Sequence, residues 1–306
     1  FNLTTAQLLD GFYTLATEDD VNSPLQGRSG KKWYPLISGD WDNWETWTLD
    51  PSGMLPDNRD MLTPTTSPTS AIDEVTILSG KVITIQPGNN NKNNSRLIVN
   101  GELNFTTTTG HSFSRIEGNG KIYLSGDNFP SGDATYFTTK DFGEGTVIFK
   151  GSSRNLANAS STYTFFNVQI DLDNPNETLV LLRNFQVNGS LLINRGKLQI
   201  NDNSTVIRNI VVENNLTIEA QAAITVGTGN TIGTYSIPSN MPADPESYHD
   251  IYHQFIVKCD ITNKGTIKFT NQNAPVYNQF TNTGAVTLRM EGSSDNNFLC
   301  FGPTDL

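Results

Sequence analysis

Residues 75–85 read Val75-Thr-Ile-Leu-Ser-Gly80-Lys-Val-Ile-Thr-Ile85, with apolar and polar side chains alternating on both sides of one glycine. Alternation with a period of two is the pattern of a β-strand that buries one face. The glycine between the two runs marks a bend, because glycine adopts positive φ at low steric cost. The stretch therefore predicts two short strands joined by a tight turn.

The same unit recurs along the chain, and its bend often reads Asn-Gly or Asn-x-Gly. Copies lie at residues 97–105, 116–124, 142–149, 185–193, 261–269 and 280–288. The glycines at 80, 101 and 120 are 21 and 19 residues apart, and those at 265 and 284 are 19 apart. Self-similarity at a fixed period indicates a repeat architecture. We expect asparagine side chains at the bends to form hydrogen bonds between successive repeats.

The length of the repeat distinguishes two all-β architectures. A β-sandwich of hairpins would repeat at about 8–12 residues, whereas a parallel β-helix needs a longer unit for each coil. The sequence thus favours an all-β fold, a right-handed parallel β-helix over residues 75–306, with the hand taken from the rule for parallel connections. Residues 1–74 lack the repeat and are predicted to form an N-terminal cap and connector. Three prolines indicate an irregular insertion at about residues 232–254.

All four tryptophans fall within the predicted cap, between Trp33 and Trp47. Trp41, Trp44 and Trp47 follow one another at intervals of three residues. One interpretation is a hydrophobic plug that shields the open end of the β-helix from water and from edge pairing. The alternative is an aromatic platform on which these three rings stack against sugars.

The charge balance disfavours partners that carry a high density of negative charge. The 306 residues carry 31 Asp and Glu against 20 Lys and Arg, a net charge of −11. No basic stripe is visible, which disfavours binding to nucleic acids and to anionic membranes. No apolar run is long enough for a membrane-spanning helix. The acidic run Glu18-Asp19-Asp20 predicts a solvated surface, with calcium binding as the alternative.

Few residues suggest catalysis. His249 and His253 are four apart and would share one face of a helix, so they are candidate metal ligands, although a structural role is favoured. Asp171 and Asp173 lie on one side of a predicted strand, where two carboxylates could serve glycoside hydrolysis. No nucleophile elbow or phosphate-binding loop is present. We therefore expect a non-catalytic protein without a cofactor, with a polysaccharide lyase, a glycoside hydrolase or a glycan-binding module as the alternative.

The chain has two cysteines, Cys259 and Cys300. They do not form a Cys-x-x-Cys pair, so zinc binding and thioredoxin-like chemistry lack ligands. The two residues can form one disulfide or remain thiols. Alternation with Val257 and Ile261 directs Cys259 toward a core, where free cysteine is common.

Two stretches together resemble a known group of proteins. They are Ser38-Gly-Asp-Trp41-Asp-Asn-Trp44-Glu-Thr-Trp47 and Ile72-Asp-Glu-Val75-Thr-Ile-Leu-Ser-Gly80-Lys-Val-Ile-Thr-Ile85. This pattern is similar to the opening of β-helix regions in large secreted surface proteins of Bacteroidota, and the likeness extends over most of residues 38–290. The chain departs from that pattern by an extra N-terminal segment and a longer Pro/Thr loop.

The resemblance implies an extracellular, cell-surface location and export by the type IX secretion system. It implies a role in adhesion, surface-layer structure or gliding, with other cell-surface or secretion-system proteins, and glycans, as partners. The chain begins at Phe1 rather than Met, so we expect a processed chain or a fragment of a longer protein.

Overall fold

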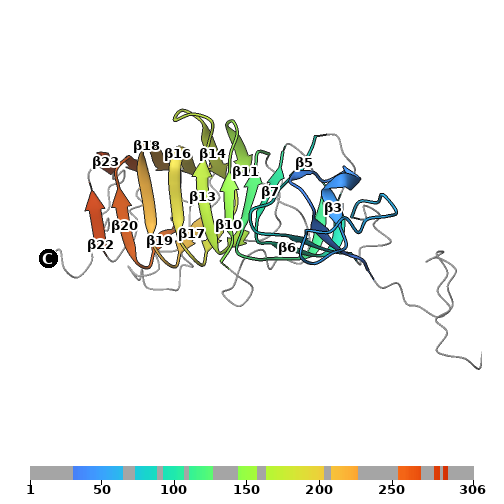
Figure 1. Ribbon diagram of the computed structural model, residues 1–306. Coiled ribbons are helices and arrows are strands. Elements are labelled where there is room, and N and C mark those ends of the chain that lie inside the picture. Colours follow the sequence, from blue (N-terminus) through green and yellow to red (C-terminus); the bar gives the residue numbers. More distant parts are fainter. Residues whose placement is uncertain are drawn as a thin grey trace, which may run out of the picture.

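The computed structural model describes residues 30–64, 73–87, 92–106, 110–126, 144–156, 163–202, 208–226, 254–269, 279–282 and 285–288 (Figure 1). These residues form strands β1 to β23 and one 3-10 turn, η1 (Trp44–Thr46), and they contain no α-helix. No helix among them has the length and apolar character needed to cross a membrane. The prediction of an all-β chain is confirmed.

The strands form sheets of five, fourteen and four strands. The five-stranded sheet runs in the order β3 (Trp47–Thr48), β1 (Lys32–Pro35), β4 (Glu74–Ile77), β6 (Asn93–Val99) and β8 (Ser112–Glu117). The four-stranded sheet consists of β12 (Tyr163–Phe165), β15 (Phe185–Val187), β17 (Asn209–Val212) and β19 (Gln254–Val257).

The fourteen-stranded sheet runs the length of the described structure. Its main path is β2 (Gly39–Asp40), β5 (Val82–Ile85), β7 (Glu102–Phe105), β9 (Lys121–Leu124), β10 (Thr146–Phe149), β13 (Asn167–Asp171), β16 (Leu191–Ile200), β18 (Leu216–Val226), β20 (Asp260–Asn263) and β22 (Gln279–Asn282). Off this path lie β11 (Arg154–Leu156), β14 (Thr178–Leu181), β21 (Thr266–Phe269) and β23 (Ala285–Leu288). Figure 1 shows these strands side by side along an elongated stack.

From β4 to β9 and from β15 to β20, consecutive strands of the chain alternate between sheets, and each pairs in parallel with a strand of a neighbouring layer. Val75 of β4 is in register with Leu97 of β6, and Leu97 with Ile116 of β8, so the layers repeat after 22 and 19 residues. This step is the predicted repeat. From Leu216 to Ile261 the step is 45 residues. The insertion predicted at 232–254 falls within that step, but apart from Gln254 it lies outside the described residues.

The side chains that point inward form one core that continues from layer to layer. Val75, Leu97 and Ile116 are each 0% exposed and lie in register on neighbouring strands. Stacked strands are about 4.8 Å apart, so branched apolar side chains at the same position in successive layers are in direct contact. The alternation seen in the sequence is therefore an alternation of buried and outward-facing positions.

The bend glycines serve a different purpose from the one expected. Gly80 has a φ of 77°, but Gly101, Gly120 and Gly265 do not have positive φ. At these three, an added Cβ would lie 2.3, 2.1 and 2.3 Å from a backbone carbonyl oxygen of the preceding layer. The prediction that glycine supplies positive φ is thus wrong at these bends, where close approach between layers excludes any side chain.

Asparagine side chains connect the bends, as expected. Asn100 Oδ1 accepts a hydrogen bond from the Asn119 N–H at 3.3 Å, and Asn119 Oδ1 accepts one from the Glu144 N–H at 2.8 Å. One layer on, Asn167 donates to the Glu144 carbonyl at 2.9 Å and accepts from the Ser190 N–H at 3.0 Å. The partners in these bonds are backbone groups rather than other amides, because the layer spacing places a bend N–H within reach of the amide below.

The described part of the predicted cap joins the same two sheets as the repeat. β1 pairs in parallel with β4, and β2 pairs in parallel with β5. Only β3 pairs antiparallel, with β1, among the strands that the structure describes. Residues 30–48 therefore add a layer to the N-terminal end of the stack. Residues 1–29 and 65–72 of the predicted cap and connector lie outside the described residues.

Candidate functional site

The predicted sugar-stacking platform is not formed. Trp41 and Trp47 are 0% and 1% exposed, and only Trp44, at 39%, has an accessible ring. The Trp41 and Trp47 rings meet edge to face at 5.1 Å, and the Trp47 indole N–H donates to the Trp41 carbonyl at 2.6 Å. A sugar needs an open ring face, so the assignment is wrong for Trp41 and Trp47. These rings instead complete the core of the first layer.

A group of exposed apolar side chains lies beside this buried cluster. Trp44, Met54, Leu55, Met61 and Leu62, here called the apolar loop surface, are between 39% and 79% exposed. Together with Ile37 they are the large hydrophobic side chains found exposed among the residues whose burial the structure describes. Contiguous exposed apolar surface commonly marks a contact site for another molecule.

Two polar side chains hold these loops in place. Asn58 Nδ2 donates to the carbonyls of Trp44 and Leu62 at 3.0 and 2.7 Å, which brings the two residues together. The Asp50 carboxylate accepts from the backbone N–H groups of Met54 and Leu55 at 3.1 and 3.0 Å. These bonds, with the one from Ser52 as the largest contribution, lower the pKa of Asp50 to about 2. The exposed apolar side chains are therefore presented on ordered backbone.

The surroundings of this surface are acidic. Residues 37–62 contain one basic residue, Arg59, and six acidic residues, Asp40, Asp42, Glu45, Asp50, Asp57 and Asp60. An excess of one charge creates a field that attracts the opposite charge and repels its own. A partner that combines apolar side chains with Lys or Arg would complement both properties.

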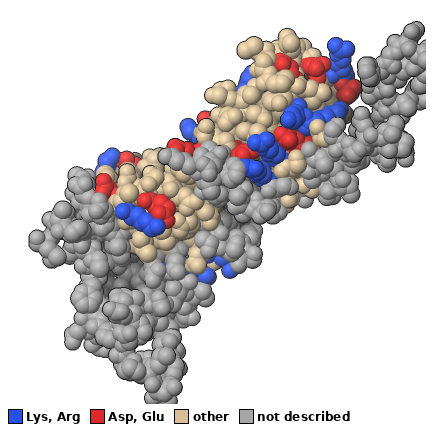
Figure 2. Space-filling view, turned by 90° about the horizontal axis from the view of Figure 1, so that it is seen from below, with Lys and Arg blue, Asp and Glu red and all other residues tan. Residues whose placement is uncertain are grey.

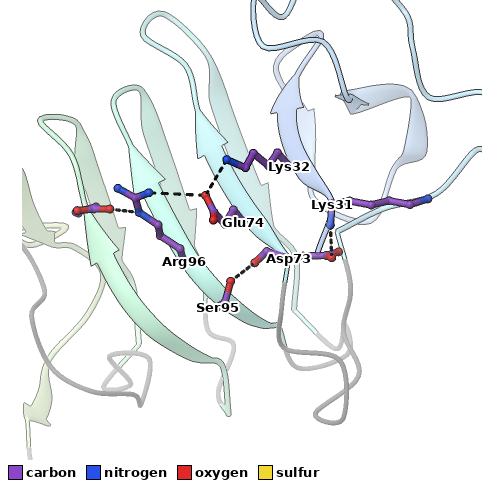
Figure 3. Close-up of polar contacts among 7 residues, drawn as sticks. Lys31, Lys32, Asp73, Glu74, Ser95 and Arg96 are labelled. Carbon is purple, nitrogen blue, oxygen red and sulfur yellow. Dashed lines mark hydrogen bonds and ion pairs between the residues drawn. The ribbon is translucent and has the colours of Figure 1, made fainter. Parts of the chain in front are cut away.

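A ladder of charges crosses the outer face of the five-stranded sheet (Figure 3). Glu74 Oε2 lies 3.9 Å from Lys32 Nζ and 3.7 Å from Arg96 Nη1, and these three residues are in register on β1, β4 and β6. Arg96 Nε also donates to Glu117, whose other oxygen is 3.3 Å from Arg115 Nη2. Figure 2 shows the two signs of charge adjacent along this side of the molecule. The ladder contains three cations and two carboxylates, so one positive charge is in excess, and it connects four strands.

Asp73 is a second polar link at the same sheet (Figure 3). Its carboxylate accepts from the Lys31 N–H at 3.0 Å and from the Trp33 indole N–H at 2.9 Å. Its carbonyl accepts from both the N–H and the hydroxyl of Ser95 at 3.0 Å. Asp73 is 4% exposed and connects three layers. The sequence analysis missed this role, although an acid directly before an alternating strand was the available signal.

A buried ion pair lies at the Trp41 end of the core. The Lys92 side chain is 0% exposed, and its Nζ is 2.5 Å from Asp42 Oδ1. The Lys92 N–H donates to His111 Nδ1 at 2.9 Å. Burial, and then the positive charge of Lys92, lower the pKa of His111 to about 4, against a smaller opposite effect of Asp42. The sequence offered no signal for this group, because Lys92 stands in an asparagine-rich run that resembles a solvated loop.

The predicted acid pair, Asp171 and Asp173, forms contacts with other layers of the stack. Asp171 Oδ1 accepts from Asn194 Nδ2 at 3.0 Å and lies 3.7 Å from Arg195 Nη2, both on the next strand. The Asp173 backbone N–H donates to the Gly151 carbonyl at 3.1 Å. Asp171 therefore takes part in contacts between layers, and the arrangement indicates no particular reaction.

The remaining predicted site residues fall largely outside the described structure. Cys259 is half-buried, with its Sγ 3.5 Å from the Glu213 carbonyl oxygen. Cys300 lies outside the described residues, so a disulfide between the two stays one of the two alternatives. His249, His253 and the run at 18–20 are also outside the described residues. Within the described ranges, no three His, Cys, Asp or Glu side chains are grouped to hold a metal ion.

Comparison of the chain with protein-family models, with curated proteins and with solved structures found no match.

Proposed function

We propose that the chain is a non-catalytic structural and adhesive module of a larger cell-surface protein, located outside the cell. Its architecture is a right-handed parallel β-helix, with the N-terminal segment capping the first coil. In support, strands β4 to β9 alternate between sheets and pair in parallel one layer on, with steps of 22 and 19 residues between β4, β6 and β8. A parallel connection of this kind is right-handed in nearly all proteins.

The main support for a structural role is that outward polar groups bind the next layer. The charge ladder from Lys32 to Glu117 and the asparagine bonds at the bends both run along the stack. These contacts recur from layer to layer and oppose separation of the layers, most strongly at Glu117, which is largely buried between two arginines. Such a stack suits a rigid spacer better than a site of substrate turnover.

The adhesive part of the proposal depends on the apolar loop surface. It combines exposed apolar side chains on ordered loops with an acidic surrounding. The resemblance to surface proteins of Bacteroidota adds other cell-surface or secretion-system proteins as the partners, and type IX secretion as the route of export. A partner face with apolar residues among lysines or arginines would fit.

The test combines mechanics with an activity assay on the full chain. Pulling the chain by its two ends should give high resistance and stepwise extension, as layers separate one at a time. Incubation with acidic polysaccharides should release neither unsaturated nor reducing ends. Release of such ends, lost in a charge-to-Ala variant, would replace the structural role with a catalytic one. Smooth extension at low force would contradict a rigid module.

A further inference from the structure

The ion pair between Lys92 and Asp42 has an unusual environment for a lysine. The Lys92 side chain is fully buried, and its Nζ lies 2.5 Å from Asp42 Oδ1, although the two residues are 50 positions apart. We propose that these side chains join in an intramolecular isopeptide bond, an amide between Lys92 Nζ and Asp42 Cγ. The inference is independent of the function proposed above.

The hydrogen-bonding capacity of the amine favours the amide. An ammonium group has three N–H donors, but among the described residues Lys92 Nζ contacts a single acceptor, the Asp42 carboxylate. A buried charge with unsatisfied donors is costly, and one ion pair rarely offsets that cost. An amide nitrogen is uncharged and has one N–H, so it suits this position better.

The reacting groups are held in place by the backbone. The Lys92 N–H donates to His111 Nδ1 at 2.9 Å, and the Lys92 carbonyl accepts from the Ser112 N–H at 2.8 Å. Next to Asp42, the Trp41 N–H donates to the Thr84 carbonyl at 2.8 Å. Anchoring both residues converts amide formation into a reaction between neighbours, which raises its rate and its equilibrium yield.

Aromatic rings pack against Trp41 and His111, the residues next to the pair. Trp41 packs against Phe113 at 6.3 Å, and Phe105 packs against both Phe113 at 6.2 Å and His111 at 5.4 Å. In apolar surroundings an amine and a carboxylic acid compete more effectively with the ion pair, because isolated charges lose their hydration. Complete burial of the Lys92 side chain also limits the access of water to the amide nitrogen.

The reaction balances without a co-reactant. One proton passes from the Lys92 ammonium to the Asp42 carboxylate, which gives an amine and a carboxylic acid. The nitrogen lone pair attacks Cγ, the N–C bond forms, and the C–O bond of the acid hydroxyl breaks. That hydroxyl leaves as water with a second proton from nitrogen, and the third proton stays on the amide. Asp42 is 34% exposed, which provides an exit for the water.

The decisive measurement is the intact mass of the denatured, reduced full chain, followed by protease digestion. We expect a mass one water below that of the sequence, and a branched peptide that joins residues 42 and 92. If digestion gives residues 42 and 92 in separate peptides, the proposal is overturned, whether the intact mass equals that of the sequence or is one water lower. Loss of water with separate peptides would indicate a succinimide elsewhere in the chain.

Variants make the assignment specific. Asp42→Asn should give the same branched product, because ammonia then leaves in place of water. Asp42→Ala and Lys92→Met should show the masses of their sequences. As a matched control, Lys264 and Glu219 form an exposed pair at 2.9 Å and should remain unlinked. Because the linkage is mapped in the wild-type chain, a variant that fails to fold does not affect the result.

Discussion

At the scale of single residues, the polar groups enclosed between layers have the greatest influence on stability. Asp73, Lys92 and His111 are each almost completely buried, and each has a partner in a neighbouring layer. Removing one member of such a group leaves its partner desolvated, which costs more than the net value of the bond. Most outward-facing polar residues lack this sensitivity.

Asp73→Ala should lower the free energy of unfolding by about 3 kcal/mol, because the Trp33 indole and the Lys31 N–H lose a charged acceptor. Asp173→Ala serves as the control, since only its backbone N–H has a described bond. Denaturant titration of the full chain measures both. Equal losses in the two variants would show that Asp73 has no special role.

His111 should make stability depend on pH. Its folded-state pKa of about 4 is below the ordinary 6.5, so the unfolded chain takes up the proton first as the pH falls. The contribution of His111 to the free energy of unfolding is complete above pH 6.5. It is lost as the pH falls toward 4, at no more than about 1.4 kcal/mol per pH unit. Burial is the larger cause, so the direction holds whether or not Lys92 is charged.

Comparison with His111→Gln isolates this effect, because glutamine does not titrate. The difference in unfolding free energy between wild type and variant should shrink as the pH is lowered through this range. A difference that stays constant with pH would rule out His111 as the titrating group.

At the scale of elements, the bends and the charge ladder determine how neighbouring layers fit together. Gly120 lies directly over the Gly101 carbonyl, and Glu117 lies between Arg96 and Arg115 on adjacent strands. Both arrangements depend on the parallel register, because a shift of one residue would move every such group to the opposite face. Changes at these positions test the stacking of elements.

Gly120→Ala should destabilise the chain by about 3 kcal/mol or more, because the new Cβ would lie 2.1 Å from the Gly101 carbonyl oxygen. Gly80→Ala is the matched comparison. No atom lies within 4 Å of its added Cβ, and only the positive φ of 77° opposes the change, at about 1 kcal/mol. Thermal unfolding of both variants measures the difference, and a reversed order would contradict the close-approach explanation.

Glu117→Ala should leave Arg96 and Arg115 facing each other in register without the carboxylate between them. We expect a loss of about 2 kcal/mol, decreasing as added salt screens the repulsion. Unfolding at low and high ionic strength measures this dependence. A loss that is independent of salt would mean that packing, rather than charge, accounts for the effect.

At the scale of the whole molecule, the two kinds of surface are segregated. Along the stack, polar groups bind one another, whereas the large apolar side chains found exposed, among the residues whose burial is described, belong to the segment 37–62. This segment connects and flanks the first strands of the described structure (Figure 1). This asymmetry favours a molecule that contacts a partner through its N-terminal end, while the rest of the stack serves as a rigid spacer.

The double change Met61→Ser and Leu62→Ser should leave the free energy of unfolding within about 0.5 kcal/mol, because both side chains are exposed. The same change should weaken binding of the full chain to an immobilised peptide of alternating Leu and Lys. A Leu and Glu peptide of equal length controls for charge, and Thr262→Ala controls for position. Undiminished binding by the double variant would exclude these residues from the contact.

Patterns within about twenty residues were enough to predict the strands of the repeated units, their alternating buried positions and the step between layers. Each of these depends on a local period, as in residues 75–85 and 97–105. The asparagine bonds at the bends also followed from the repeat. The sugar-stacking alternative was wrong for Trp41 and Trp47, because their spacing of three carries no information about which rings the neighbouring strands cover.

The amino-acid sequence by itself determined that the chain forms short parallel strands that recur about every twenty residues. Alternation and spacing are local properties, so they can be read from the sequence. Only the tertiary structure decided that Asp42 meets Lys92 and that Asp73 joins three layers. It also decided that Gly120 faces a carbonyl oxygen. Those contacts join residues from different layers, so they depend on how the layers stack in space, which no local pattern specifies.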